Sequence, residues 1–248
     1  MEASAHNCES GFDALSGSPQ LAWLPALMQC ADPLFPTGGY AHSMGLEQWA
    51  KQQSYRSAED LSAFLLQHAG PALARMELPY LRLARQALAS EDWETLMAIE
   101  QELDASKWSA ELRAASVAQG RGRLRLLRKL YPNCERMDAY HARQQQRLVF
   151  GHHSVVTALQ SILLQIPLPA SLLAYAYQSL ANYASAAIKL LRLSPESVQY
   201  ALTQGIAVIP EWVEASMCVE RDAVGWLAPA FDISSAQHAS AFSRLFIS

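Results

Sequence analysis

The sequence is poor in cysteine and has no two cysteines close together. Its 248 residues include only Cys8, Cys30, Cys134 and Cys218, and no CxxC pair occurs. A disulfide framework and a cysteine-rich zinc site both need paired spacings, so the sequence argues against both. The four scattered thiols indicate a protein of a reducing compartment.

The sequence also lacks an excess of positive charge and a long apolar run. Its formal net charge is −4, which disfavours general binding to a nucleic-acid backbone. The apolar runs at 159–166 and 206–209 end at Pro167 and Pro210, far short of the ~20 residues of a membrane span. Residues 1–18 have no basic start and no apolar core. We therefore expect no secretory signal, no membrane contact and a cytoplasmic location.

Alternation of apolar and polar residues with a period of two is nearly missing, and no internal repeat occurs. Helical spacing in stretches rich in Ala and Leu takes its place. We predict an all-α fold, a single compact helical bundle domain of about ten helices over residues 19–248. Residues 1–18, rich in Ser, Ala and Gly, are predicted to be a disordered N-terminal tail.

Capping residues and prolines place the predicted helices along the chain. Ser57 begins a helix with an approximate capping box, Ser106 caps a long helix, and Ser194 precedes the last long helix. Pro71 and Pro79 punctuate the segment after residue 57. The predicted helices span about 19–31, 40–53, 57 onward, 72–90, 92–104, 106–131, 137–150, 152–166, 170–192 and 195–209. The alanine-rich stretch 170–192 is expected to be the central helix, because small residues let helix axes approach closely.

Residues 32–47, which read DPLFPTGGYAHSMGLE, are the most distinctive stretch of the chain. Pro33 and Pro36 fix φ at about −65° and disfavour helix between them. Gly38 and Gly39 permit the positive φ values of a sharp reversal, and helical spacing resumes afterwards. We predict a rigid elbow between two helices, which is a usual place for a contact surface.

No histidines have the spacing of a metal centre. His152 and His153 are adjacent, so their side chains diverge by about 100° on a helix, and Gly151 separates them from His141. No HxxxH, HExxH or CxxC spacing occurs. We expect buried or surface imidazoles and no metal-binding residues.

Catalytic patterns are missing as well. His42 and Ser43 are neighbours that would diverge on a helix, and no strand–Ser–helix elbow surrounds them. The Thr37-Gly38-Gly39 stretch lacks the GxxxxGK[ST] spacing of a phosphate loop, so a tight turn explains it better. DDxxD pairs and ExxH di-iron spacings do not occur either. We expect no enzyme and no cofactor.

Charge is unevenly distributed along the chain. Residues 91–111 hold seven acids against one lysine, and residues 113–147 hold nine Arg or Lys against two acids. Arg121, Arg125 and Arg128 share one helical face. One explanation is a solvated face that pairs with the acidic helix upstream. The other is a docking site for an acidic protein partner, because arginine suits carboxylates.

The C-terminal stretch is too apolar for a free tail. Its apolar residues include Phe231, Ile233, Phe242 and Ile247. Two explanations are open: the stretch packs back on the bundle, or it anchors a partner.

Together these segments resemble the urease accessory protein UreF family. The elbow is similar to the family pattern Pro-x-Gly-Gly-aromatic-x-x-Ser-x-Gly-Leu-Glu. Further segments resemble the family in the same order: SVAQGR at 116–121, FGHHSVV at 150–156, SAAIKL at 185–190 within the helix at 175–191, and the final stretch 232–248. The resemblance covers about residues 20–248. One departure is the turn at 192–194, which lacks a glycine that the family often has.

The resemblance implies a non-enzymatic all-α protein, usually a homodimer, that scaffolds nickel insertion into urease. Its implied partners are UreD (also called UreH), the nickel-carrying GTPase UreG and the urease apoprotein. The complex, rather than this chain, would hold the nickel; a nickel-storage or metal-sensing helical protein is the alternative. Lys189 is a candidate for tuning the GTPase. The residues implied in partner binding are Pro36, Gly38, Gly39, Tyr40, Ser43, Glu47, Gly120, Arg121, Lys189, Arg244, Leu245 and Phe246.

Overall fold

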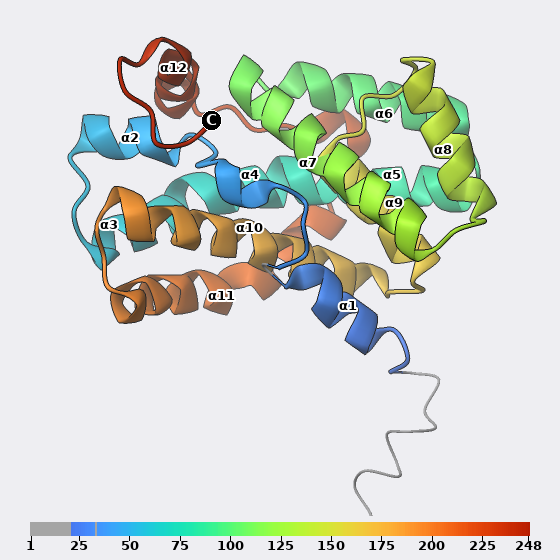
Figure 1. The fold of residues 1–248 in the computed structure, drawn as a ribbon, viewed down its shortest axis with the longest axis horizontal. Helices are drawn as coiled ribbons and strands as arrows, with labels where there is room; N and C mark the ends of the chain where they lie inside the picture. Colours follow the sequence, from blue (N-terminus) through green and yellow to red (C-terminus); the bar gives the residue numbers. More distant parts are fainter. Residues whose placement is uncertain (1–20, 33) are drawn as a thin grey trace, which may run out of the picture.

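The structure is a computed structural model that describes residues 21–32 and 34–248. These residues form an all-α fold with no β-strand, as predicted (Figure 1). The tail predicted over residues 1–18 lies outside the described residues. Within them, no helix combines the length and the apolar content that crossing a bilayer requires.

The α-helices follow one another with short connections. Their bounds are α1 Leu24–Ala31, α2 Leu46–Gln53, α3 Ala58–Phe64, α4 Gly70–Ala72, α5 Leu78–Ala89, α6 Trp93–Ser106, α7 Ala110–Leu130, α8 Glu135–Gln145, α9 His153–Leu163, α10 Leu168–Leu190, α11 Pro195–Met217 and α12 Pro229–Gln237.

Helices α3, α4 and α5 form one continuous rod. The π-helical segments Leu65–Ala69 and Leu73–Glu77 join them, so Pro71 and Pro79 lie inside the rod rather than breaking it. A proline cannot donate the α-helical hydrogen bond, and the wider π turns around each one re-pair the neighbouring backbone groups. With this rod counted once, the described residues hold ten α-helical rods, matching the predicted number.

The two longest helices, α10 and α11, pack side by side along the lower left of Figure 1. The buried face of α10 carries the small residues Ala176, Ala184 and Ala187, and Gly205 of α11 lies against Leu180. Helix α10 also contacts α1, α2, α5 and α9. The prediction of an alanine-rich central helix is therefore confirmed.

A second group of helices, α5 to α9, occupies the other half of the molecule (Figure 1). Helix α9 packs on both α5 and α7, and all of its residues from His153 to Ser161 are buried. Gly120 of α7 lies directly against the loop before α9. A Cβ on Gly120 would collide with the main-chain oxygen of Gly151, so only glycine fits there.

Several predicted helix boundaries are wrong, among them the end of α8 at Gln145 instead of residue 150. The helix expected over 40–53 begins only at Leu46, because Gly45 takes a left-handed φ of 88°. Ser106 is the last residue of α6 rather than a cap, and Ser109 precedes α7. The last long helix runs to Met217 with Pro210 inside it, instead of ending at 209.

Two predicted helix starts are confirmed. Ser57 accepts from the Asp60 amide while the Asp60 carboxylate accepts from the Ser57 amide, which is a full capping box. Ser194 accepts from the Ser197 amide at the start of α11. The turn before it uses Arg192 at a φ of 54°, so this turn reaches the left-handed conformation without the glycine common in the resembled family.

Replacing Gly120 with alanine should destabilise the protein. The new methyl group cannot avoid backbone atoms of the 151–152 loop, so we expect a loss of about 2 kcal/mol or more in the free energy of unfolding. Urea denaturation measures it. The control Ala118→Leu adds carbon at an exposed position of the same helix and should change stability by only about 0.5 kcal/mol. Equal stability of Gly120→Ala and wild type would contradict the close approach.

Candidate functional site

The elbow consists of two reversals separated by an extended residue. Gly38 takes a φ of 86° and precedes the 3-10 turn Gly39–Ala41. His42 is extended at φ −121° and ψ 130°. The second reversal then combines Met44 at φ 52° with Gly45 at φ 88°. Gly38 and Gly45 thus set the directions in which the chain enters and leaves the elbow.

Three helices pack against the elbow. The α-carbon of Gly39 lies so close to α7 and α10 that a Cβ would be 3.1 Å from Gln119 and Asn182. A Cβ on Gly45 would be 2.8 Å from the Phe231 ring of α12. This support makes the elbow a rigid platform.

The last six residues, 243–248, which we call the closing segment, dock on the elbow. The main-chain oxygen of Ser248 accepts from the amides of Ser43 and Met44 at 2.6 and 3.1 Å and from Ser43 Oγ at 2.7 Å. The Ile247 amide donates to the Ala41 carbonyl. In Figure 1 the C-terminus accordingly lies beside α2.

The side chain of Glu47 makes several of the hydrogen bonds in this contact. Its carboxylate is 2% exposed and accepts from the amides of Leu245 and Phe246 at 3.0 Å each. Lys51 donates to it at 2.8 Å, and His238 Nε2 lies 3.3 Å away. Burial alone would raise the pKa of Glu47, but the bonds from Lys51, the two amides and His238 outweigh it and lower the pKa. The buried carboxylate is thus held in its charged form.

A second carboxylate continues the same network. Glu111, in the first turn of α7, lies 2.7 Å from His238 Nδ1 and pairs with Arg244 at 2.9 Å. His238 is therefore held between Glu47 and Glu111 with both ring nitrogens in contact with carboxylates. This network ties the closing segment to α2 and α7 at once.

Aromatic and apolar side chains form the outer rim of the contact. The ammonium of Lys189 lies 4.1 Å from the centre of the Tyr40 ring and 5.9 Å from that of Phe246, within range of cation–π attraction. Phe246 is buried, whereas Tyr40 is 65% exposed and Leu245 60% exposed. The closing segment therefore packs back on the bundle and still presents apolar groups to solvent.

The structure brings most of the sequence-predicted site residues together. Tyr40, Ser43, Glu47 and Lys189 meet the closing segment with its Arg244, Leu245 and Phe246, while Pro36, Gly38 and Gly39 shape the elbow beside it. Gly120 is not part of this surface because it is buried against the loop before α9. Arg121 lies elsewhere, in a groove between α7 and α8. The partner-binding roles of these residues stay a prediction.

Sequence reasoning missed several members of the contact. Lys51, Glu111, His42, His238 and Ser248 all bond within it. Lys51 lies four residues after Glu47, a spacing that predicts a helical ion pair and could have been found. Glu111 and Ser248 carry no such local pattern.

The reason given above for dismissing His42 and Ser43 as a catalytic pair is wrong, since neither lies on a helix. Both side chains bond Ser248: His42 Nδ1 lies 2.9 Å from its Oγ, and Ser43 Oγ donates to its main-chain oxygen. Ser43 is fully buried. Its hydroxyl group therefore holds the closing segment in place.

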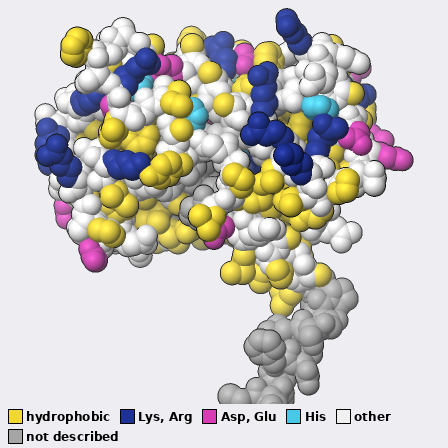
Figure 2. All heavy atoms as spheres, in the orientation of Figure 1, with side chains coloured by type: hydrophobic (Ala, Val, Ile, Leu, Met, Phe, Trp, Pro, Cys, Tyr) yellow, Lys and Arg dark blue, Asp and Glu magenta, His cyan; other side chains and the backbone are white. Residues whose placement is uncertain are grey.

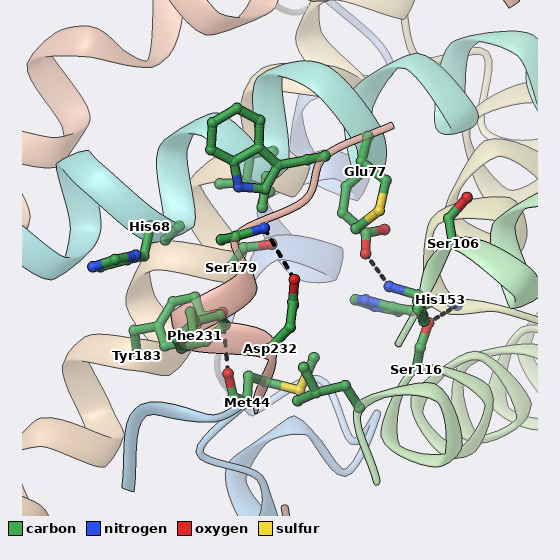
Figure 3. Close-up of a pocket in the computed structure, with 18 of the residues that line it drawn as sticks. Met44, His68, Glu77, Ser106, Ser116, His153, Ser179, Tyr183, Phe231 and Asp232 are labelled. Atoms are coloured by element: carbon green, nitrogen blue, oxygen red, sulfur yellow. Dashed lines mark hydrogen bonds and ion pairs between the residues drawn. The ribbon is translucent and has the colours of Figure 1, made fainter. Parts of the chain in front are cut away.

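A cavity of about 120 Å³ lies behind the elbow (Figure 3). Met44, His68, His153 and Phe231 line it, and Figure 3 shows His68 and Phe231 on one side with His153 on the other. Glu77, also in the wall, pairs with Lys107 and accepts from Tyr175 at 3.1 Å. Among the described residues, no three His, Cys, Asp or Glu side chains are grouped as a metal site requires.

The adjacent histidines His152 and His153 are both buried. Burial, with smaller effects of Lys107 and Arg113, lowers the pKa of His152 to about 3, although Glu77 opposes the shift. Its Nδ1 lies 3.1 Å from Ser116 Oγ and its Nε2 3.2 Å from Asp104. Burial likewise lowers the pKa of His153 well below its usual range. Both are neutral core residues, as expected.

The fold and site define an all-helical protein whose closing segment docks on the elbow and leaves apolar side chains exposed. The sequence model of the UreF family matches residues 55–205. Curated proteins named urease accessory protein UreF are similar over almost their whole length. The one from Actinobacillus pleuropneumoniae is 28% identical over 91% of this chain and 99% of its own. For the proteins from Azoarcus and Lachnoclostridium phytofermentans the values are 29% over 94% and 99% and 28% over 90% and 97%. The chain belongs to the UreF family of urease accessory proteins.

Replacing Glu47 with alanine should release the closing segment. Several charged hydrogen bonds are lost, so we expect a loss of about 2–4 kcal/mol in the free energy of unfolding and fast hydrogen exchange at the Leu245 and Phe246 amides. Mass spectrometry of the C-terminal peptide measures the exchange. Lys51→Ala removes a half-exposed partner only and should cost less than about 1 kcal/mol. Unchanged protection in Glu47→Ala would contradict the proposed role of this carboxylate.

Stability should fall in acid because His152 is buried and neutral. Its folded-state pKa of about 3 lies below the 6.5 of the exposed group, so the unfolded chain takes up the proton first as pH drops. The contribution of the neutral His152 imidazole to the free energy of unfolding is fully present above pH 6.5. As the pH falls from 6.5 toward 3, this contribution is lost by about 1.4 kcal/mol per pH unit. His152→Gln should flatten the slope of unfolding free energy against pH by that amount. Ser116→Ala keeps the imidazole and should keep the slope; equal slopes in His152→Gln and wild type would refute this assignment.

Proposed function

We propose that this protein is a scaffold for nickel insertion into urease, working through shape and without a reactive group of its own. The observation that carries the proposal is the docking of the closing segment on the rigid elbow, which presents Tyr40 and Leu245 beside the ammonium of Lys189. Family membership supports the urease connection.

The arrangement suits a protein that positions others. A contact surface costs less entropy on binding when it is ordered beforehand. Here the buried carboxylate of Glu47 and the hydroxyl of Ser43 order the closing segment before any partner arrives. Exposed aromatic and apolar groups around a buried polar anchor are typical of protein interfaces.

The partners that we propose are UreD, the GTPase UreG and the urease apoprotein, with this chain as a homodimer in the cytoplasm. Nickel is held by the complex rather than by this chain. Lys189 contributes to the surface where the GTPase is engaged.

Tyr40→Ala should abolish formation of the complex with UreD and UreG, because it removes the largest exposed ring of the surface. Deletion of residues 244–248 should do the same. Co-expression followed by affinity purification measures complex yield, and urease activity reports maturation. The helical circular dichroism signal should stay intact in both variants.

Tyr200→Ala is the matched control, since Tyr200 is 58% exposed on α11, outside the elbow and closing segment. It should leave the complex yield unchanged. A normal yield with both Tyr40→Ala and the deletion would remove the proposed surface. A wild-type chain that binds neither UreD nor UreG would remove the function itself.

A further inference from the structure

A basic groove of about 900 Å³ lies between α7 and α8. Figure 2 shows Lys and Arg side chains gathered over these helices. A single carboxylate, Asp138, lines the groove together with five cations. The cations are Arg121, Arg125, Arg128, Lys129 and Arg147. The groove is thus strongly positive on a chain whose net charge is −4.

Most of these cations have no partner within the described part of the chain. Arg128 meets Asp138 at 3.2 Å. The side chains of Arg121, Arg125, Lys129 and Arg147 make no ion pair or hydrogen bond there, and the four residues are exposed. Other cations of the same two helices are engaged; for example, Arg143 stacks on Trp93.

The acidic segment at residues 91–111 does not neutralise the cations of the groove. Glu91 pairs with Arg136, and Glu102 pairs with Arg221. Asp104 bonds His152 and Arg113, and the buried Glu100 carboxylate accepts from the loop amides at 150 and 151. Pairing with the acidic segment, the first of the two explanations offered by the sequence, thus holds for Arg113 and Arg136. Within the described residues it does not extend to Arg121, Arg125 or Arg128, and Arg128 pairs instead with Asp138.

The row of Arg121, Arg125 and Arg128 lowers the stability of α7, the helix that carries it. Arg121, Arg125 and Arg128 follow the i, i+4, i+7 spacing and extend over about 10 Å of α7. Like charges at this spacing destabilise a helix by about 0.2–0.5 kcal/mol per pair. The buried side chains Leu124 and Met137 lie in the floor between them. The chain thus carries three like charges, of which Arg128 alone has a carboxylate partner among the described residues, beside the buried side chains of Leu124 and Met137.

Carboxylates on a helix suit this groove better than a nucleic acid does. Arginine forks bind carboxylates bidentately, and acids at i, i+4 and i+7 of a partner helix would repeat the spacing of the row. A nucleic acid would need a longer basic track and exposed rings for stacking. The described lining offers one aromatic residue, the half-buried Tyr131, and the negative chain repels a long polyanion.

We infer that the α7–α8 groove binds an acidic helical segment of a partner protein through Arg121, Arg125 and Arg128. The groove shares no residue with the elbow and closing segment. The inference therefore goes beyond the proposed function and does not rest on it.

Fluorescence anisotropy with a labelled helical peptide tests the inference on the full-length protein. The peptide carries Glu at i, i+4 and i+7, and its twin carries Gln at the same positions. At low ionic strength the wild type should bind the Glu peptide at least about 10-fold more tightly than the Gln peptide. The double variant Arg121→Glu/Arg125→Glu should lose this preference, and the milder Arg125→Gln should lose about 3-fold.

Arg56→Glu is the control for charge alone, since Arg56 is exposed and lies outside the groove. It should bind the Glu peptide within about 2-fold of wild type. Equal affinity of the wild type for both peptides would overturn the inference, as would equal losses in the groove and control variants. Tighter binding of a single-stranded oligonucleotide of the same charge would also overturn it. Circular dichroism checks that each variant is folded.

Discussion

The docking of the closing segment on the elbow depends on one buried carboxylate. Glu47 lies in the first turn of α2 and accepts the amides of Leu245 and Phe246, which are almost two hundred residues away in sequence. The amide groups, Lys51 and His238 keep it charged although it is 2% exposed. An unpaired charge at that depth would be very costly, so the elbow and the closing segment stabilise each other.

The rest of the architecture serves to hold that contact still. A Cβ on Gly39 would lie 3.1 Å from Gln119 of α7 and Asn182 of α10, and a Cβ on Gly45 would collide with Phe231 of α12. The network through His238 and Glu111 reaches from the closing segment to α7, the helix that also carries the basic groove. One rigid helix thus connects two surfaces of different character, one with exposed apolar groups and one positive.

The helical class, the central alanine-rich helix and the elbow could all be predicted from the sequence, because each depends on local spacing or on residues with restricted φ. Two prolines misled the prediction. Pro210 lies within α11, and Pro71 lies between π-helical segments that packing supports. The sequence could not predict where the closing segment docks, because only tertiary packing brings Leu245 to Glu47. For the same reason, the sequence could not predict that Arg121 lies away from the elbow.

The account rests on the claim that Glu47 orders the surface that partners recognise. The affinity of the Glu47→Gln variant for UreD, measured by surface plasmon resonance against wild type, tests it most directly. The account predicts an affinity at least about 10-fold weaker, equivalent to about 1.4 kcal/mol, with unchanged helical content. An affinity equal to that of the wild type would contradict it.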